Sequence, residues 1–191
     1  MSKLFSTINA SGRFEETDNT INSGNTCLID PMSTSTHILG LGNPVIGDDG
    51  IGIRVIRELE QKLNEIPDLS VSTSCQSGLY LLEHLIGFQK VIIVDAVIRK
   101  DLPVGTIIIN MDIKAETHFK GHSPHFIGIH GVLSLGRAYG LKMPEDLILL
   151  GIVIHNDKNI TEQMSPEMEK KYGTIVKQVL KEINVHTSHL N

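Results

Sequence analysis

Residues 37–54 read His-Ile-Leu-Gly-Leu-Gly-Asn-Pro-Val-Ile-Gly-Asp-Asp-Gly-Ile-Gly-Ile-Arg, and this stretch decides the fold. A short apolar run enters a turn that is punctuated by glycines, and an apolar pattern with helical spacing begins after the turn. Glycine relieves the steric limits where a strand must turn sharply into a helix. The stretch therefore predicts a strand, a tight loop and a helix in direct succession.

Two adjacent carboxylates, Asp48 and Asp49, precede the predicted helix. Either side chain suits a helix N-cap, because a carboxylate there accepts hydrogen bonds from the backbone N–H groups of the first turn. Two neighbouring acids exceed what a cap needs, however. The stretch leaves capping open for both residues and makes Asp49 the stronger candidate for chemistry.

The composition of the 191 residues is that of a globular protein with a proper core. Lys and Arg number 17 against 22 Asp and Glu, so the net charge of −5 offers no basic field for nucleic acid. No apolar run approaches the roughly 18–20 residues that span a bilayer, and no apolar signal segment is recognisable. Cys27 and Cys75 make neither a metal-binding pair nor a disulfide framework. We therefore expect a cytoplasmic protein without membrane insertion.

Residues 1–36 are rich in Ser, Thr, Asn and Gly and are predicted to form a flexible arm, whereas 37–191 are predicted to form a single domain. Strands are predicted over 36–41, 69–75, 90–97, 105–111 and 146–153, and helices over 51–64, 79–87, 126–139 and 165–183. The connection from the third strand to the fourth is too short for a helical crossover, so the fourth should run antiparallel to the third. Alternating helices and apolar strands predict a three-layer α/β/α sandwich.

Two acids are predicted to meet at one edge of this sheet. Ligands of open α/β sheets bind outside the carboxyl ends of the strands, where the strand order reverses. Asp49 lies in the loop after the first strand, and Asp95 closes the third strand after four consecutive branched residues. A carboxylate at the end of a buried strand is costly unless it is paired, hydrogen-bonded or bound to a cation. Asp95 is therefore predicted to be functional.

A histidine-rich segment precedes the third predicted helix, and its members are His118, His122, His125 and His130. His125 follows Ser123-Pro124, where that helix should begin, so its ring could face the same edge. His118 and His130 are interpreted as solvated residues, and His155, after the fifth strand, is a weaker candidate. Two carboxylates and one imidazole suit a borderline divalent metal ion.

Several common site motifs are incomplete or missing. The run GLGNPVIG at 40–47 misplaces the third glycine of a dinucleotide fingerprint, and the end of the second strand offers no acid for a ribose. The sequence contains no Gly-Lys-Ser/Thr of a P-loop, no His-Glu-x-x-His zinc helix and no Gly-x-Ser-x-Gly elbow. A conventional metalloprotease is therefore not indicated.

Taken together, the motifs resemble those of the endopeptidases that mature nickel–iron hydrogenases, over roughly residues 37–183. They are GLGNPVIGDDGIG at 40–52, VIIVDAV at 91–97, PVGTI at 103–107, SPHFIGI at 123–129, LGI at 150–152 and MSP at 164–166. The resemblance implies a phosphorylase/hydrolase-like fold, with helices on both faces of a five-stranded mixed sheet whose fourth strand is antiparallel. It also implies removal of a C-terminal extension from the precursor of the hydrogenase large subunit.

In that family two acids and a histidine form the metal-contacting, catalytic site, and they correspond here to Asp49, Asp95 and His125. The first family acid is often glutamate, and the aspartate here is one methylene shorter. The chain reads IVIHN at 152–156, where the family often has a glutamine–proline pair. The arm at 1–36 is foreign to the family pattern.

The resemblance implies that nickel arrives seated in the precursor, so that binding by the three residues checks that metal insertion is complete. Other divalent ions are expected to occupy the site in vitro. The attacking water could be activated by the metal, by Asp49 or Asp95 acting as a base in an aspartic-type mechanism, or by a resident zinc ion. A maturation chaperone that binds the precursor without cutting it stays open, as does a small-molecule hydrolase. We expect the protein to be a monomer.

Overall fold

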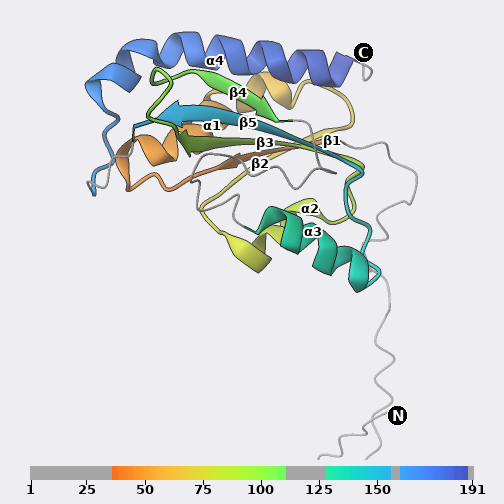
Figure 1. Cartoon of the computed structure of the whole chain (residues 1–191). Helices are drawn as coiled ribbons and strands as arrows, with labels where there is room; N and C mark the ends of the chain where they lie inside the picture. Colours follow the sequence, from red (N-terminus) through yellow and green to blue (C-terminus); the bar gives the residue numbers. More distant parts are fainter. Residues whose placement is uncertain (1–35, 111–127, 156–159, 189–191) are drawn as a thin grey trace, which may run out of the picture. The chain divides into compact units, whose positions relative to one another are not determined.

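The computed structural model describes residues 36–110, 128–155 and 160–188 (Figure 1). The predicted arm at 1–36 therefore lies outside the described residues, apart from Thr36, with which the first strand begins. Among the described residues, no helix is both long and apolar enough to cross a membrane.

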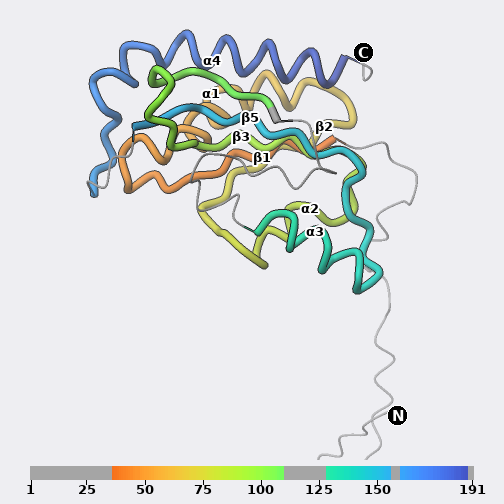
Figure 2. The backbone as a smooth tube through the Cα atoms, viewed as in Figure 1, coloured from red at the N-terminus to blue at the C-terminus, as the bar shows by residue number. Residues whose placement is uncertain are grey.

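Five strands form one mixed sheet in the order β2-β1-β3-β5-β4, which can be followed along the backbone in Figure 2. The strands are β1 (Thr36–Leu41), β2 (Leu69–Ser74), β3 (Lys90–Ile98), β4 (Ile107–Asn110) and β5 (Asp146–Ile154). Four of them run parallel, and β4 alone pairs antiparallel, with β5. The predicted antiparallel fourth strand is confirmed, and its neighbour in the sheet is β5.

Helices cover both faces of this sheet and complete the predicted three-layer sandwich (Figure 1). α1 (Ile51–Leu63) and α4 (Pro166–Thr187) lie on one face. The 3₁₀ turn η2 (Gly78–Leu81) and the helices α2 (Leu82–Leu85) and α3 (Ile129–Ala138) lie on the other. A second 3₁₀ turn, η1 (Gly47–Gly50), leads into α1.

The alternation of side chains along β3 divides the core in two, because successive residues of a strand point to opposite faces. Ile92 and Val94 pack against the α1–α4 layer. Val91 and Ile93 pack against the α2–α3 layer. All four are fully buried, and burial of each such side chain stabilises the fold by about 1.5–3 kcal/mol. A continuous apolar run was therefore the correct signal of a strand that is buried on both faces.

Two helices differ from their predicted bounds. The helix predicted over 79–87 is a 3₁₀ turn followed by the four-residue α2. Gly87, with φ +89°, stands in the left-handed region just past its end. The last helix runs on to Thr187, which is buried and donates its hydroxyl to the Ile183 carbonyl at 2.9 Å. The start of α4 is as predicted, with Ser165 as N-cap and Pro166 in the first turn.

Candidate active site at the carboxyl edge of the sheet

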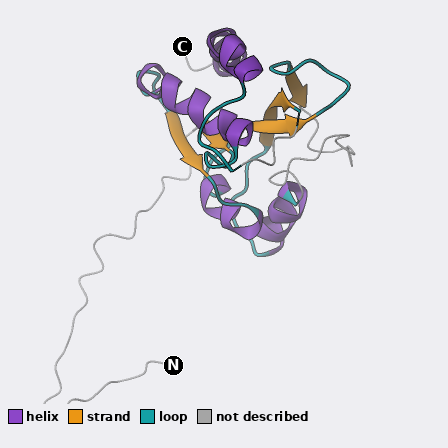
Figure 3. Cartoon of the chain, turned by 90° about the vertical axis from the view of Figure 1, so that its left-hand side faces the viewer, coloured by secondary structure: helices purple, strands orange, loops and turns teal. Residues whose placement is uncertain are grey.

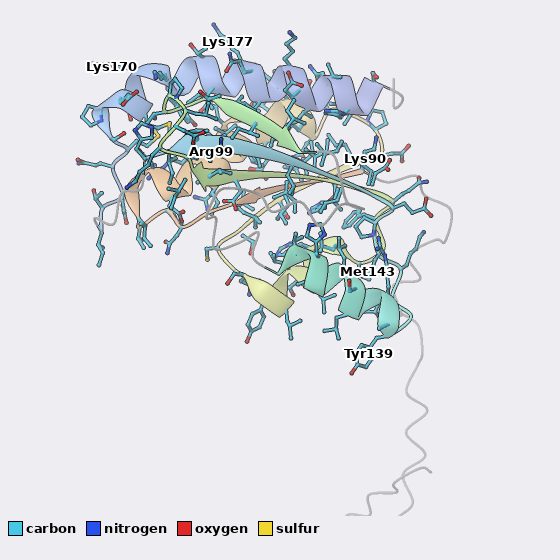
Figure 4. All side chains as sticks on the ribbon, in the orientation of Figure 1. Lys90, Arg99, Tyr139, Met143, Lys170 and Lys177 are labelled. Carbon is cyan, nitrogen blue, oxygen red and sulfur yellow. The ribbon has the colours of Figure 1, made fainter. Side chains whose placement is uncertain are left out.

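The strand order reverses between β1 and β3, because the chain leaves β1 for β2 on one side and returns to β3 on the other. Ligands of open α/β sheets bind at such a point, outside the carboxyl ends of the strands. Figure 3 looks onto this edge, with helices above and below the sheet. Figure 4 marks the direction of β3, since Lys90 lies at its amino end and Arg99 just beyond its carboxyl end.

The residues at this edge follow from the strand register. Gly40 of β1 pairs with Val94 of β3, which is the last pair of the two strands, and Asp95 directly follows Val94. Leu41 pairs with Ser74, the last residue of β2. The edge therefore presents Ser74 and Leu41 side by side, with Asp95 one residue after the last pair of β1 and β3 and the β1–α1 loop directly after Leu41.

The β1–α1 loop folds back tightly on itself, and two glycines permit this. Gly42 has φ +143°, and a Cβ at that position would collide with the Asp49 carbonyl oxygen. A Cβ at Gly52 would collide with the carbonyl oxygens of Leu41 and Val94, so α1 starts directly against the ends of β1 and β3. The predicted role of glycine as a steric relief is confirmed at both positions.

Asp49 is held by the loop at the reversal point. Its Oδ2 accepts a hydrogen bond from the backbone N–H of Asn43 at 3.0 Å. Its side chain is half-buried, and the η1 turn that carries it contacts β3. The turn that carries Asp49 therefore lies against the strand that carries Asp95.

Asp48, the adjacent acid, has a different partner. It is 4% exposed, and its Oδ1 accepts a hydrogen bond from the backbone N–H of Ser165 at 2.7 Å. The capping of α1, which the sequence left open for Asp48 and Asp49, is not observed, because the N-cap of α1 is Gly50 and no side chain caps it. Asp48 instead ties the β1–α1 loop to the residue that caps α4.

Asp95 is fully buried within β3. The prediction that it closes the strand is wrong, because β3 continues beside β5 as far as Ile98. The alternation along the strand turns its side chain toward the face that carries Val91 and Ile93, and its Oδ1 accepts a hydrogen bond from the Ala96 N–H at 2.8 Å. Its neighbour on β5 is Gly151, which places no side chain beside it. A carboxylate at a site of such low exposure is the strongest sign of function in the described part of the chain.

The third predicted ligand, His125, lies outside the described residues, as do His118 and His122. His130 and His155 agree with their expected surface positions. His130, in the first turn of α3, is exposed, and exposed His155 contacts the Leu102 carbonyl oxygen through Nε2 at 2.8 Å. Among the described residues, no group of three or more His, Cys, Asp and Glu side chains could hold a metal ion. A metal site here therefore needs a ligand beyond Asp49 and Asp95.

Arg54 holds the β1–α1 loop in place, and this role was not predicted from the sequence. Its Nη2 donates to the carbonyl oxygens of Pro44, at 3.5 Å, and of Glu162, and so it joins the β1–α1 loop to the segment before α4. The Arg54 carbonyl in turn accepts a hydrogen bond from the Tyr172 hydroxyl at 3.1 Å. Burial raises the pKa of Tyr172, which keeps this donor protonated. One arginine on an amphipathic helix gives no signal of such a role.

The family model described as HycI, hydrogenase maturation protease, matches residues 53–182, which is more than half of the chain. The chain belongs to the hydrogenase maturation protease family. This confirms the resemblance drawn from the motifs, and the chain is accordingly an endopeptidase of hydrogenase maturation. The matched region contains Asp95 and begins just after the loop that carries Asp49.

Named proteins of this family share the sequence and the fold. The hydrogenase 2 maturation protease of Escherichia coli is 33% identical over 118 residues, which are 61% of this chain and 71% of that protein. The hydrogenase expression/formation protein HoxM of Cupriavidus necator is 31% identical over 146 residues, which are 75% of this chain and 65% of that protein. The solved structure of the hydrogenase maturating endopeptidase HybD from E. coli aligns with a TM-score of 0.61 at 25% identity, over 80% of this chain and 93% of HybD.

Proposed function

We propose that this hydrogenase maturation protease removes a C-terminal extension from the nickel-loaded precursor of a nickel–iron hydrogenase large subunit. The observation that carries the proposal is the fully buried Asp95 at the carboxyl edge, on the strand that contacts the turn carrying Asp49. Two carboxylates from different elements, brought to one reversal point, form an arrangement that favours a bound cation.

In this proposal Asp49, Asp95 and His125 bind the nickel ion of the precursor, which is part of the substrate. Oxygen and nitrogen ligands both suit a borderline divalent ion. Binding would place the scissile peptide against the protease only when the ion is present. A precursor without nickel would lack the ion that these three residues bind, so the difference in affinity between the two precursor forms provides the selectivity.

Asp49 is the better candidate for the base that activates water. A base must exchange its proton with solvent, and the half-buried Asp49 is open to water whereas Asp95 is fully buried. The Asn43 N–H that donates to Asp49 Oδ2 fixes the orientation of that carboxylate. Polarisation of the water by the substrate's nickel is the second option.

We also place the reaction in the reducing cytoplasm, and the free, exposed thiol of Cys75 supports this compartment.

A non-proteolytic chaperone would use the same ligands, so it is separated from the protease by whether the precursor becomes shorter.

The test is to incubate the purified protein with a hydrogenase large-subunit precursor, with and without nickel, and to measure the intact mass. We expect loss of a C-terminal peptide from the nickel-loaded precursor only. Cleavage of both forms would keep the protease but remove nickel as the recognition element. A precursor that binds but stays uncut would support the chaperone instead.

A further inference from the structure

A cavity of about 290 Å³ opens beside the β1–α1 loop. Pro44 of the loop, Ile53 and Arg57 of α1, and residues 73–76 at the end of β2 line it. The cavity therefore shares the loop that carries Asp49, but it lies on the β2 side of that loop, away from Asp95. No group assigned to the metal-contacting site lines it.

The lining combines three kinds of contact. Pro44 and the buried Ile53 supply apolar surface, and Thr73, Ser74 and Gln76 supply polar groups. The Ser74 hydroxyl oxygen already accepts a hydrogen bond from the Gln76 backbone N–H at 3.1 Å, so its own proton is available to a ligand. Such a lining suits a side chain with an aliphatic stem and a polar end.

Arg57 sets the charge of the cavity. It is exposed, and within the described ranges no carboxylate lies within 4.0 Å of its guanidinium. Arg57 is the only Lys or Arg among the residues that line this cavity in the described part of the chain. A guanidinium is charged at all working pH values and binds a carboxylate through two parallel hydrogen bonds. The ligand best matched to this wall is therefore an acidic side chain.

The strand register gives the separation between this cavity, at Ser74, and the proposed catalytic residue Asp95. Ser74 of β2 pairs with Leu41 of β1, and Asp95 of β3 directly follows Val94, which pairs with Gly40 of β1. Because β1 lies between β2 and β3, Ser74 and Asp95 are about two strand spacings apart. Two spacings of about 4.8 Å make about 10 Å, which an extended peptide spans with about three residues at roughly 3.3 Å each. A precursor segment that crosses the edge at Asp95 would therefore place a side chain in the cavity about three residues away.

We propose that this cavity is a specificity subsite, which receives an acidic side chain of the precursor about three residues from the scissile bond, and that Arg57 selects it. The inference rests on the proposed function, because it assumes that a peptide of the precursor lies across this edge. Arg57 is a specificity-determining residue in this account and takes no part in the chemistry.

The experiment uses the nickel-loaded precursor of a hydrogenase large subunit, with Glu or Lys placed singly at each of the four positions on either side of the scissile bond. We expect one position, about three residues from that bond, at which the wild-type protein cleaves the Glu precursor at least about tenfold faster than the Lys precursor. Arg57→Glu should reverse this preference, and Arg57→Gln should abolish it. Thermal melts of both variants verify that they are folded.

Lys62→Glu is the matched control. Lys62 is also exposed on α1 and the charge change is the same, but it does not line the cavity, so the Glu/Lys preference should stay as in the wild type. Equal preferences in the wild type and Arg57→Glu at every position would overturn the subsite while leaving the endopeptidase intact. An equal shift in Lys62→Glu would overturn it as well, by showing a general charge effect. A wild-type protein that cut no precursor would overturn the proposed function and the subsite together.

Discussion

The two ends of the sheet bury titratable groups in opposite ways. At the amino end, His37 of β1 is 3% exposed, its ring stacks on Phe88 at 4.4 Å, and its Nε2 lies 3.0 Å from the Ser72 hydroxyl. Burial, with a smaller effect of nearby His84, lowers the pKa of His37 to about 4. This histidine is therefore neutral at pH 7, and its neutral partners match that state.

At the carboxyl end, Asp95 is buried to the same degree but has a backbone N–H as a hydrogen-bond partner, from Ala96. Backbone donors favour the charged form of a carboxylate, and Asp49 with its Asn43 N–H repeats the pattern. The difference teaches that burial alone does not indicate a site. A backbone N–H donor does not indicate one by itself either, since Asp48, which ties the β1–α1 loop to Ser165, accepts such a hydrogen bond as well.

The largest expected effect is on precursor processing, which should depend on Asp95 at the carboxyl end of the sheet and not on His37 at the amino end. Asp95→Asn keeps an oxygen that can accept from Ala96 N–H but removes the charge, so precursor processing should fall by about 10³-fold or more. The melting temperature should stay the same or rise, because burial of a charge is costly. His37→Phe, which preserves stacking on Phe88, should process the precursor at the wild-type rate. The measurement is the intact mass of the nickel-loaded precursor over time.

Wild-type processing by Asp95→Asn would contradict the role of Asp95. A comparable loss of processing in a folded His37→Phe protein would remove the contrast between the two ends.

The next largest effect is the pH dependence of the free energy of unfolding that His37, at the amino end of the sheet, should cause. The pKa of His37 is about 4 in the fold and 6.5 in the unfolded chain, so the unfolded chain binds more protons between these values. His37 should therefore lower the free energy of unfolding as the pH falls from 6.5 through 4. The loss is about 3 kcal/mol, because the pKa differs between 6.5 in the unfolded chain and about 4 in the fold. Urea unfolding of the wild type and His37→Phe from pH 7 to pH 4 measures the effect.

The carboxylates titrate in both proteins, so the difference between the two stability curves isolates His37. Parallel curves would show that His37 does not change its protonation on unfolding.

The smallest effect separates the two adjacent acids of the carboxyl end. Asp48→Ala leaves the backbone N–H of Ser165 without its acceptor, which should lower the free energy of unfolding by about 1–3 kcal/mol while processing continues. Asp49→Ala should abolish processing with a smaller loss of stability, since Asp49 is only half-buried. Urea unfolding and precursor processing are measured on both variants.

Ser165→Ala serves as the control for this pair. It removes the hydroxyl that accepts from Met168 N–H, at a cost of about 1 kcal/mol, but leaves the contact of its backbone with Asp48. If Asp48→Ala were inactive and Asp49→Ala active, Asp48 rather than Asp49 would carry the chemistry, and the proposed role of Asp49 would be wrong.

Much of the site could be predicted because its signals are local. Asp95 ends a run of branched apolar residues, and such a run forms a buried strand wherever it stands in the chain. The glycines around Asp49 indicate a tight turn for a reason that lies within the turn itself. The role of Asp48 stayed open in the sequence for the opposite reason. The partner of Asp48 is Ser165, 117 residues away, and no local pattern reports so distant a contact.

The sequence by itself therefore determined the strands, the longer helices and the family, and it made Asp49 and Asp95 candidates, since periodicity and the cost of burying a carboxylate are properties of neighbouring residues. Only the tertiary structure decided that Asp48 is tied to Ser165, that β4 lies beside β5, and that α1, the β1–α1 loop and the end of β2 enclose a cavity beside Arg57. These features arise between segments far apart in the chain, and the packing of the layers on the sheet brings them together.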